Sequence, residues 1–182
     1  MKNVFLITCF LVLISACNTP QEKINTTDID FNYIKLLDQE IKNLSNMHAG
    51  LQKSIYYQGK NEKKTIDAPD WDKELRPFFQ CNIQTPAFNK LYSESRRVSG
   101  DSLILVYTAR TDKSEVRRLE IYLLRLKLDS IRAELFRQNS YFTLNETLQY
   151  APDYGYLISG SQKMMFASET VYRIEARLML PS

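Results

Sequence analysis

The feature that most constrains the fold is an alternation of apolar and polar side chains in the C-terminal half. Near the C-terminus, Arg173, Glu175 and Arg177 stand between apolar residues: Tyr172, Ile174, Ala176, Leu178 and Leu180. Successive side chains of a β-strand point to opposite faces of its sheet, so this segment is predicted to be a strand with one buried face. The stretch SLILVYTA, residues 102–109, is apolar on both faces, which predicts a central strand.

Residues 118–130, RLEIYLLRLKLDS, carry two apolar sets that are out of phase. Leu119, Ile121 and Leu123 fall on one face of a strand, whereas the leucines at 124, 126 and 128 fall on the other. Either both faces are half buried, or a β-bulge at 123–124 returns all six side chains to one face, and we favour the bulge. The pair at 129–130 is then expected to turn the chain into a strand over 131–136, and a further strand is expected over 155–166.

The N-terminal half of the domain shows helical spacing instead. A helix is predicted over 28–47, capped by Thr27 or Asp28, with a buried stripe: Ile34, Leu37, Ile41 and Leu44. Residues 51–57 fit a helix or a strand, 59–65 an exposed turn between two arms, and 70–79 a short helix that Pro77 ends or kinks. This order predicts the α+β class, with N-terminal helices packed on one antiparallel β-meander sheet of about five strands.

The N-terminus is a separate element. After Lys2, residues 4–14 form an apolar run of 11 residues, far shorter than the roughly 20 needed for a membrane-spanning helix. Ile14, Ser15, Ala16 and Cys17 follow in an order that resembles the lipobox of bacterial lipoproteins. The alternative is an ordinary secretory signal with a chance cysteine behind it.

The lipobox resemblance implies that residues 1–16 are a signal peptide, cut off after recognition of Ile14, Ser15 and Ala16. Cys17 then carries the acyl chains that anchor the protein, because two or three chains hold firmly where one does not. Residues 17–27 are the lipidated cysteine and a polar tether, and 28–182 form a single domain. In such lipoproteins an aspartate after the cysteine favours the inner membrane, so Asn18 points to the outer membrane. Surface-exported lipoproteins of this kind carry an acidic run after the cysteine, and the chain has only Gln21-Glu22-Lys23 there, which favours the periplasmic side over the cell surface.

The body of the chain carries a second resemblance. The segments GKNEKKT, DWDKEL, NIQTPAF and LQYAPDYGYLISGSQK, together with the closing strand, occur in an order similar to that in uncharacterised outer-membrane lipoproteins of Bacteroidota-type bacteria. In those proteins, too, the lipobox is followed by a polar tether and an α+β domain. This resemblance implies a location and an order of elements, and no activity.

Charge and cysteine usage exclude some classes of partner. Without residues 1–16 the chain keeps 166 residues with 23 Lys and Arg against 21 Asp and Glu, a formal charge of +2. Such a balance offers no basic stripe for nucleic acid. Cys9 leaves with the signal and Cys17 is lipidated, so Cys81 has no intramolecular disulfide partner. A buried thiol is the simplest interpretation, and an intermolecular bridge or a reactive thiol is the alternative.

The residue types that carry catalysis are sparse. His48 is the only histidine, and no GxSxG elbow, P-loop or GxGxxG motif is present. Asp70, Asp72 and Glu74 could form a carboxylate site, but acids at this spacing also suit a helix N-terminus. A tyrosine cluster at 150, 154 and 156 could form a sugar- or peptide-binding platform, or simply anchor strands and a turn. The sequence therefore predicts no catalytic, cofactor or metal site.

Three functions are consistent with these observations. We favour a non-enzymatic, membrane-anchored envelope lipoprotein that binds another protein or stabilises an assembly. The alternative is a carrier or sensor of an apolar ligand, a lipid or lipoprotein, held in a cavity between sheet and helix. A hydrolase with two carboxylates in a cleft is the third hypothesis.

Overall fold

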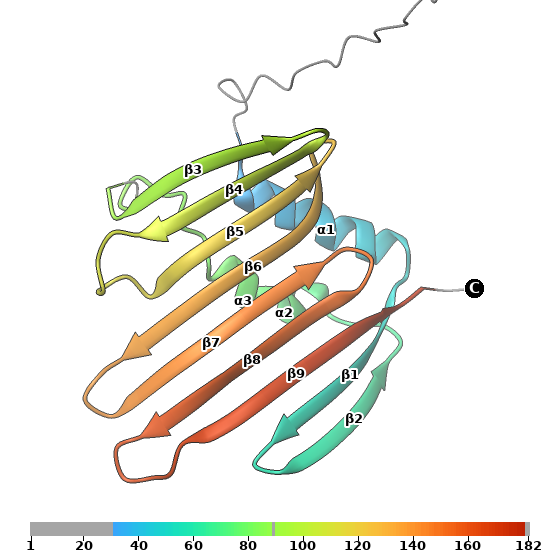
Figure 1. The fold of residues 1–182 in the computed structure, drawn as a ribbon. Helices are drawn as coiled ribbons and strands as arrows, with labels where there is room; N and C mark the ends of the chain where they lie inside the picture. The colour runs from blue at the N-terminus through green and yellow to red at the C-terminus, as the bar shows by residue number, and fades with distance from the viewer. Residues whose placement is uncertain (1–30, 89, 181–182) are drawn as a thin grey trace, which may run out of the picture.

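The structure, a computed structural model, describes residues 31–88 and 90–180. These residues form one nine-stranded antiparallel sheet in the order β2-β1-β9-β8-β7-β6-β5-β4-β3 (Figure 1). The strands are β1 (Gly50–Tyr57), β2 (Lys60–Ile66), β3 (Tyr92–Ser99), β4 (Ser102–Ala109), β5 (Val116–Leu124), β6 (Lys127–Gln138), β7 (Phe142–Ala151), β8 (Gly155–Met164) and β9 (Thr170–Met179). From β3 to β9 the chain meanders, and β9 then pairs with β1.

Three helices lie against one face of the sheet, behind it in Figure 1: α1 (Tyr33–Asn46), α2 (Trp71–Glu74) and α3 (Arg76–Phe79). The side chain of Asn32 caps α1 by accepting a hydrogen bond of 2.9 Å from the Lys35 amide. Within the residues that the structure describes, no helix is both long enough and apolar enough to cross a bilayer.

The expected fold, helices on a five-stranded meander, is wrong. The described chain is mostly one nine-stranded sheet with small helices, although both kinds of element are present. Four strands were missed because their patterns are weak. β2 (KNEKKTI) and β3 (YSESRRVS) are edge strands that expose almost every side chain, so neither shows an apolar face. The pattern of β1 fits a helix or a strand equally, and β7 mixes polar and apolar residues.

The predicted bulge at 123–124 is a hairpin turn instead. Arg125 and Leu126 adopt positive φ angles of 51° and 61°, and Leu124 pairs with Lys127 across the turn. Such turns usually carry Asn or Gly, so Arg-Leu gave no turn signal. A second hairpin supports this turn, since Asp101 accepts hydrogen bonds from the Arg125 amide at 2.8 Å and from its Nε at 2.9 Å.

Other boundaries also differ from expectation. The segment at 129–130 lies inside β6 rather than at a turn. The register between β5 and β6 shifts at this point, since Tyr122 pairs with Ser130 whereas Leu123 pairs with Leu128. β4, β8 and β9 lie where they were predicted, but β4 is next to an edge strand rather than central. Helix α1 begins at Tyr33, and the expected caps Thr27 and Asp28 lie outside the described residues.

The two faces of the sheet have different roles. The covered face holds the core, in which leucines such as Leu37, Leu105 and Leu119 are fully buried between α1 and the strands. Burial of each such side chain is worth about 1.5–3 kcal/mol. Helix α1 is fixed across this face because Tyr33 donates a hydrogen bond of 3.0 Å to the carbonyl of Phe78, and its own amide donates one of 2.7 Å to Gln84.

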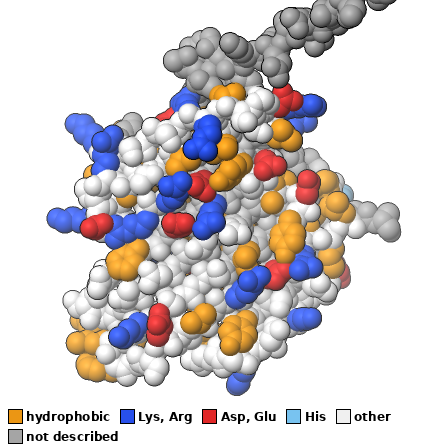
Figure 2. All heavy atoms as spheres, in the orientation of Figure 1, with side chains coloured by type: hydrophobic (Ala, Val, Ile, Leu, Met, Phe, Trp, Pro, Cys, Tyr) orange, Lys and Arg blue, Asp and Glu red, His pale blue; other side chains and the backbone are white. Residues whose placement is uncertain are grey.

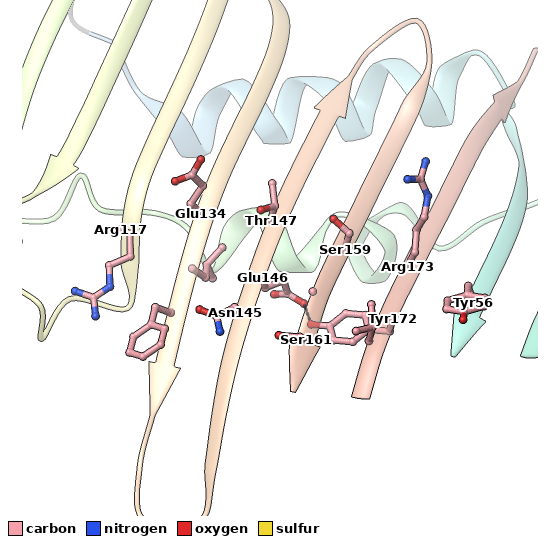
Figure 3. Close-up of a pocket in the computed structure, with 14 residues that line it drawn as sticks. Tyr56, Arg117, Glu134, Asn145, Glu146, Thr147, Ser159, Ser161, Tyr172 and Arg173 are labelled. Carbon is pink, nitrogen blue, oxygen red and sulfur yellow. Dashed lines mark hydrogen bonds between the residues drawn. The ribbon is translucent and has the colours of Figure 1, made fainter. Parts of the chain in front are cut away.

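A close contact on the covered face explains Gly160 of β8. The ring of Tyr172, from β9, lies over this glycine and donates a hydrogen bond of 2.5 Å to Glu146 of β7 (dashed in Figure 3). A Cβ atom on Gly160 would lie 2.4 Å from the Asn145 carbonyl oxygen and 2.9 Å from the Tyr172 hydroxyl. Only glycine therefore fits beneath the ring.

We expect Gly160→Ala to lower the free energy of unfolding by about 1–3 kcal/mol, because the strand and the ring must move apart. Urea unfolding followed by circular dichroism measures this change. Ser159→Ala, next to it in β8 but on the other face, is the matched control and should change stability by less than about 0.5 kcal/mol. Equal stability of the two variants would contradict the packing described here.

Candidate functional site

The face of the sheet that the helices leave uncovered points toward the viewer in Figure 2 and carries mainly polar and charged side chains. A trough runs along its middle, over β7 and β8. Its floor consists of small or uncharged side chains from β7 (Asn145, Thr147, Gln149, Ala151) and β8 (Gly155, Leu157, Ser159, Ser161). From residue 145 to residue 151, six steps of about 3.4 Å give a length of about 20 Å.

The rims of the trough come from larger side chains on the neighbouring strands. In Figure 3, Glu134, Thr147, Ser159 and Arg173 stand in a row across β6, β7, β8 and β9, as the strand register requires. Two grooves make up the trough. One of about 750 Å³ lies between Phe136 and Tyr56, and one of about 370 Å³ lies beside Tyr122 and Tyr154.

Arginine–glutamate pairs line both rims. On β5 and β6, Arg118 contacts Glu120 at 2.6 Å and Arg132 contacts Glu134 at 3.2 Å. On β9, Glu175 is shared by two arginines, Arg177 at 2.8 Å and Arg173 at 3.4 Å. Arg117 pairs with Asp112 at 3.5 Å, so with this pair the rims carry five arginines against four acids, an excess of one positive charge.

Two of the rim carboxylates, Glu175 and Glu120, remain ionised at neutral pH because their pKa values are lowered. The hydrogen bond from Tyr154, together with Arg177 and Arg173, lowers the pKa of Glu175 to about 2. Partial burial alone would raise the pKa of Glu120, but hydrogen bonds from Arg118 and Tyr122 outweigh it and lower that pKa. The rims therefore keep a fixed pattern of charge at neutral pH.

Aromatic rings also border the trough. The guanidinium of Arg117 lies over the ring of Phe136, 4.9 Å from its centre, and that of Arg177 lies 5.5 Å from the centre of the Tyr154 ring. Stacking and hydrogen bonds together hold these arginines in place, since Nη1 of Arg117 donates to the Thr111 carbonyl at 3.2 Å and Nε of Arg177 donates to Glu175 at 2.8 Å. The rims therefore carry positioned cationic groups beside the floor.

The covered face holds a different group of polar residues. Glu40 of α1 is buried and accepts a hydrogen bond of 3.1 Å from Tyr150. Its burial raises its pKa, although the hydrogen bonds from Tyr150 and Asn43 oppose that shift. Nearby, Glu74 accepts hydrogen bonds from Tyr156 and from Lys53, the latter at 2.5 Å. These contacts tie the helices to the sheet.

The raised pKa of Glu40 gives a prediction about pH. Below the ordinary pKa of 4.5, the Glu40 carboxyl is protonated in both the folded and the unfolded state. Above it, the unfolded state loses the proton at a lower pH than the folded state does. The stability of the wild-type protein should therefore fall as pH rises from about 4.5 through the raised pKa of the folded state. Glu40→Gln keeps an acceptor for Tyr150 and should remove this contribution, so the free energy of unfolding of the variant should rise relative to that of the wild type as pH increases above about 4.5.

Urea unfolding at a series of pH values tests this expectation. Asp38→Asn is the matched control, because Asp38 lies on the same helix but is exposed. We expect the control to follow the pH dependence of the wild type. A Glu40→Gln variant that loses stability in parallel with the wild type would contradict the assigned role of burial.

Among the residues that the structure describes, those singled out in the sequence have side chains apart from the trough, except Tyr154. Ile14, Ser15, Ala16 and Cys17 lie outside the described residues. His48 is exposed in the turn after α1, with a φ of 50°, and its Nδ1 lies 3.1 Å from the Asn46 carbonyl.

Cys81 is fully buried, as the simplest interpretation expected, and its thiol contacts the Pro77 carbonyl at 3.5 Å. Burial raises the pKa of this thiol to about 12. The thiolate, the reactive form, is therefore rare at neutral pH.

The predicted tyrosine cluster divides between the two faces. Tyr150 and Tyr156 are buried among the core residues, and Tyr154 alone borders the trough.

The acids at 70, 72 and 74 separate as well. Asp70 caps α2, whereas Glu74 joins Lys53 and Tyr156. In the part of the chain that the structure describes, no three His, Cys, Asp or Glu side chains form a group that could hold a metal ion.

Sequence reasoning missed the trough because it missed β7, which supplies half of the floor. The signal was available in part, since Asn145, Thr147 and Gln149 alternate with half-buried or buried neighbours. Comparison of the chain with protein-family models and with curated proteins finds no match. The function is therefore inferred from the lipobox-like residues 14–17 and from the geometry of the trough.

Proposed function

We propose that this protein is a lipid-anchored, non-enzymatic binding module of the bacterial cell envelope, and that it binds an extended acidic segment of another envelope protein in the trough on β7 and β8. The observation that carries the proposal is the shape and charge of the uncovered face. Small or uncharged side chains form a floor of about 20 Å between rims that carry more arginines than acids.

The anchor part of the proposal rests on the order of residues at the N-terminus. A short positive start, an apolar run and the sequence Ile14-Ser15-Ala16-Cys17 match the requirements for export and lipidation. The lipid would hold the domain at the outer membrane through the polar tether. This part can be tested without knowledge of any ligand.

We expect mass spectrometry of the protein purified from membranes of a bacterial host to find Cys17 as the first residue, with two or three acyl chains attached. Cys17→Ser should leave the protein without acyl chains, and Cys9→Ser, inside the segment that is removed, is the matched control. An unmodified Cys17, or a chain cleaved elsewhere, would overturn the anchor.

The ligand class follows from the dimensions of the trough. An extended polypeptide advances about 3.4 Å per residue, so about six residues fit along the floor. Hydroxyl and amide groups on the floor, such as Thr147, Gln149 and Ser159, can pair with the main chain of such a segment. The N–H groups that the rim arginines do not use in their pairs with Asp112 and Glu175 can donate to its acidic side chains.

The apolar-ligand carrier has less support. That hypothesis needs a cavity between α1 and the sheet, whereas the two grooves of the trough lie on the opposite face.

Fluorescence anisotropy with labelled peptides of about six residues tests the ligand class. We expect acidic peptides to bind more tightly than neutral or basic ones, with an affinity that falls as salt rises. Thr147→Tyr fills the floor and should weaken binding by about tenfold or more, since the peptide must leave the floor.

Ser95→Tyr is the matched control, because Ser95 is exposed on the uncovered face of the edge strand β3 and pairs with Val106, away from the trough. Its affinity should stay within about twofold of the wild type. Equal loss in both variants, or equal binding of acidic and basic peptides, would overturn the proposed ligand class.

A further inference from the structure

Three exposed apolar side chains gather at one end of the sheet, away from both the core and the trough. Tyr141 lies in the turn between β6 and β7, and Met165 and Phe166 lie in the turn between β8 and β9. Their exposed fractions are 71%, 61% and 93%. We call these three residues the apolar tips. In Figure 2, hydrophobic side chains gather at the lower left, where Figure 1 places the ends of these two hairpins.

The two turns form one unit. The Met165 amide donates a hydrogen bond of 2.8 Å to the carbonyl of Tyr141, and Phe142 pairs with Met164 at the adjoining ends of β7 and β8. The Met164 carbonyl also accepts a hydrogen bond of 3.2 Å from the Ala167 amide, which closes the second turn. The apolar tips are therefore presented together by the backbone.

We propose that the apolar tips insert into the surface of a lipid bilayer and set the orientation of the domain on the membrane. Side chains at the ends of hairpins form a convex projection. A rigid protein surface would need a matching pocket to bury them, whereas the fluid bilayer surface closes around a projecting ring. Tyrosine and phenylalanine, joined here by methionine, are typical of such interfacial contacts.

Charge around the tips fits an anionic lipid surface. Lys163 is exposed beside Met164, and Lys60, Lys63 and Lys64 lie on β2, whose hairpin with β1 ends on the same side of the sheet (Figure 1). Two acids, Glu62 and Glu169, lie in the same region, which leaves an excess of two positive charges. Lysines near an anionic bilayer strengthen the attachment of apolar side chains.

The proposed lipid on Cys17 is compatible with this orientation. The chain from Cys17 to Phe31 has 14 peptide steps and can span at most about 50 Å. The longest strand, β6, has 12 residues and a length of about 40 Å. The anchor thus permits the tips to reach the bilayer, and the tips would select which end of the sheet faces it.

Co-sedimentation with vesicles of phosphatidylethanolamine and phosphatidylglycerol tests the inference. The chain from residue 18 onward is used without its lipid, because every core residue of the described structure lies between Phe31 and Leu178. We expect it to bind these vesicles and to bind more weakly as salt rises. Phe166→Ser and Met165→Ser should each weaken vesicle binding by about tenfold, since each loses a buried apolar side chain.

Leu124→Ser is the matched control. Leu124 is 48% exposed but lies in the hairpin at the opposite end of β6, so its vesicle binding should equal that of the wild type. Thermal melts of the variants check that the fold is kept. No binding by the wild type, or equal loss in Leu124→Ser and Phe166→Ser, would overturn the inference.

A second copy of the chain is the competing occupant of the tips. Sedimentation velocity without lipid decides between the two, and the inference predicts a monomer. A dimer that Phe166→Ser disrupts, with no vesicle binding, would make the tips an interface between copies and overturn the membrane contact. These outcomes are independent of peptide binding in the trough and of lipidation at Cys17, so each part of the account can fail by itself.

Discussion

The pairing of β9 with β1 is the interaction on which the rest of the structure depends. It runs without interruption from Gly50–Met179 to Tyr57–Tyr172 and joins the last strand of the chain to the first. Because α1 leads directly into β1, this pairing also sets one end of the helix. The other end is held near β4, where Gln84 accepts a hydrogen bond from the Tyr33 amide and donates one to Tyr107. Helix α1 therefore crosses the sheet and closes the core.

The division between the two faces follows from that arrangement. With the apolar side chains on the face that the helices cover, the other face is released from packing and can vary strand by strand in side-chain size. The trough arises because small side chains on β7 and β8 lie between large side chains on β6 and β9. No loop or insertion is needed to build it.

The sequence predicted the parts of the fold that have a regular apolar pattern. The alternation in β9 and the apolar runs of β4 and β8 were sufficient, and so was the stripe of Leu37 and Leu44 in α1. Failures occurred where tertiary contacts replace a local signal. The positive φ angles of Arg125 and Leu126 depend on Asp101, which is distant in sequence. The pairing of β1 with β9 leaves no local signal, and without it and β7 the candidate site could not be predicted.

The edge strands have a consequence for how the domain can recognise another molecule. β2 and β3 expose charged side chains such as Lys64 and Arg97, which oppose the addition of a further strand. A partner chain would then be recognised by side chains on the uncovered face and not by hydrogen bonds to the backbone of an edge strand. The backbone hydrogen bonds between strands maintain the fold, whereas side chains on the uncovered face would contact a partner. The rim residues can therefore be substituted one by one while the sheet is kept. The domain can thus acquire new specificity in its lineage without passing through an unfolded intermediate sequence.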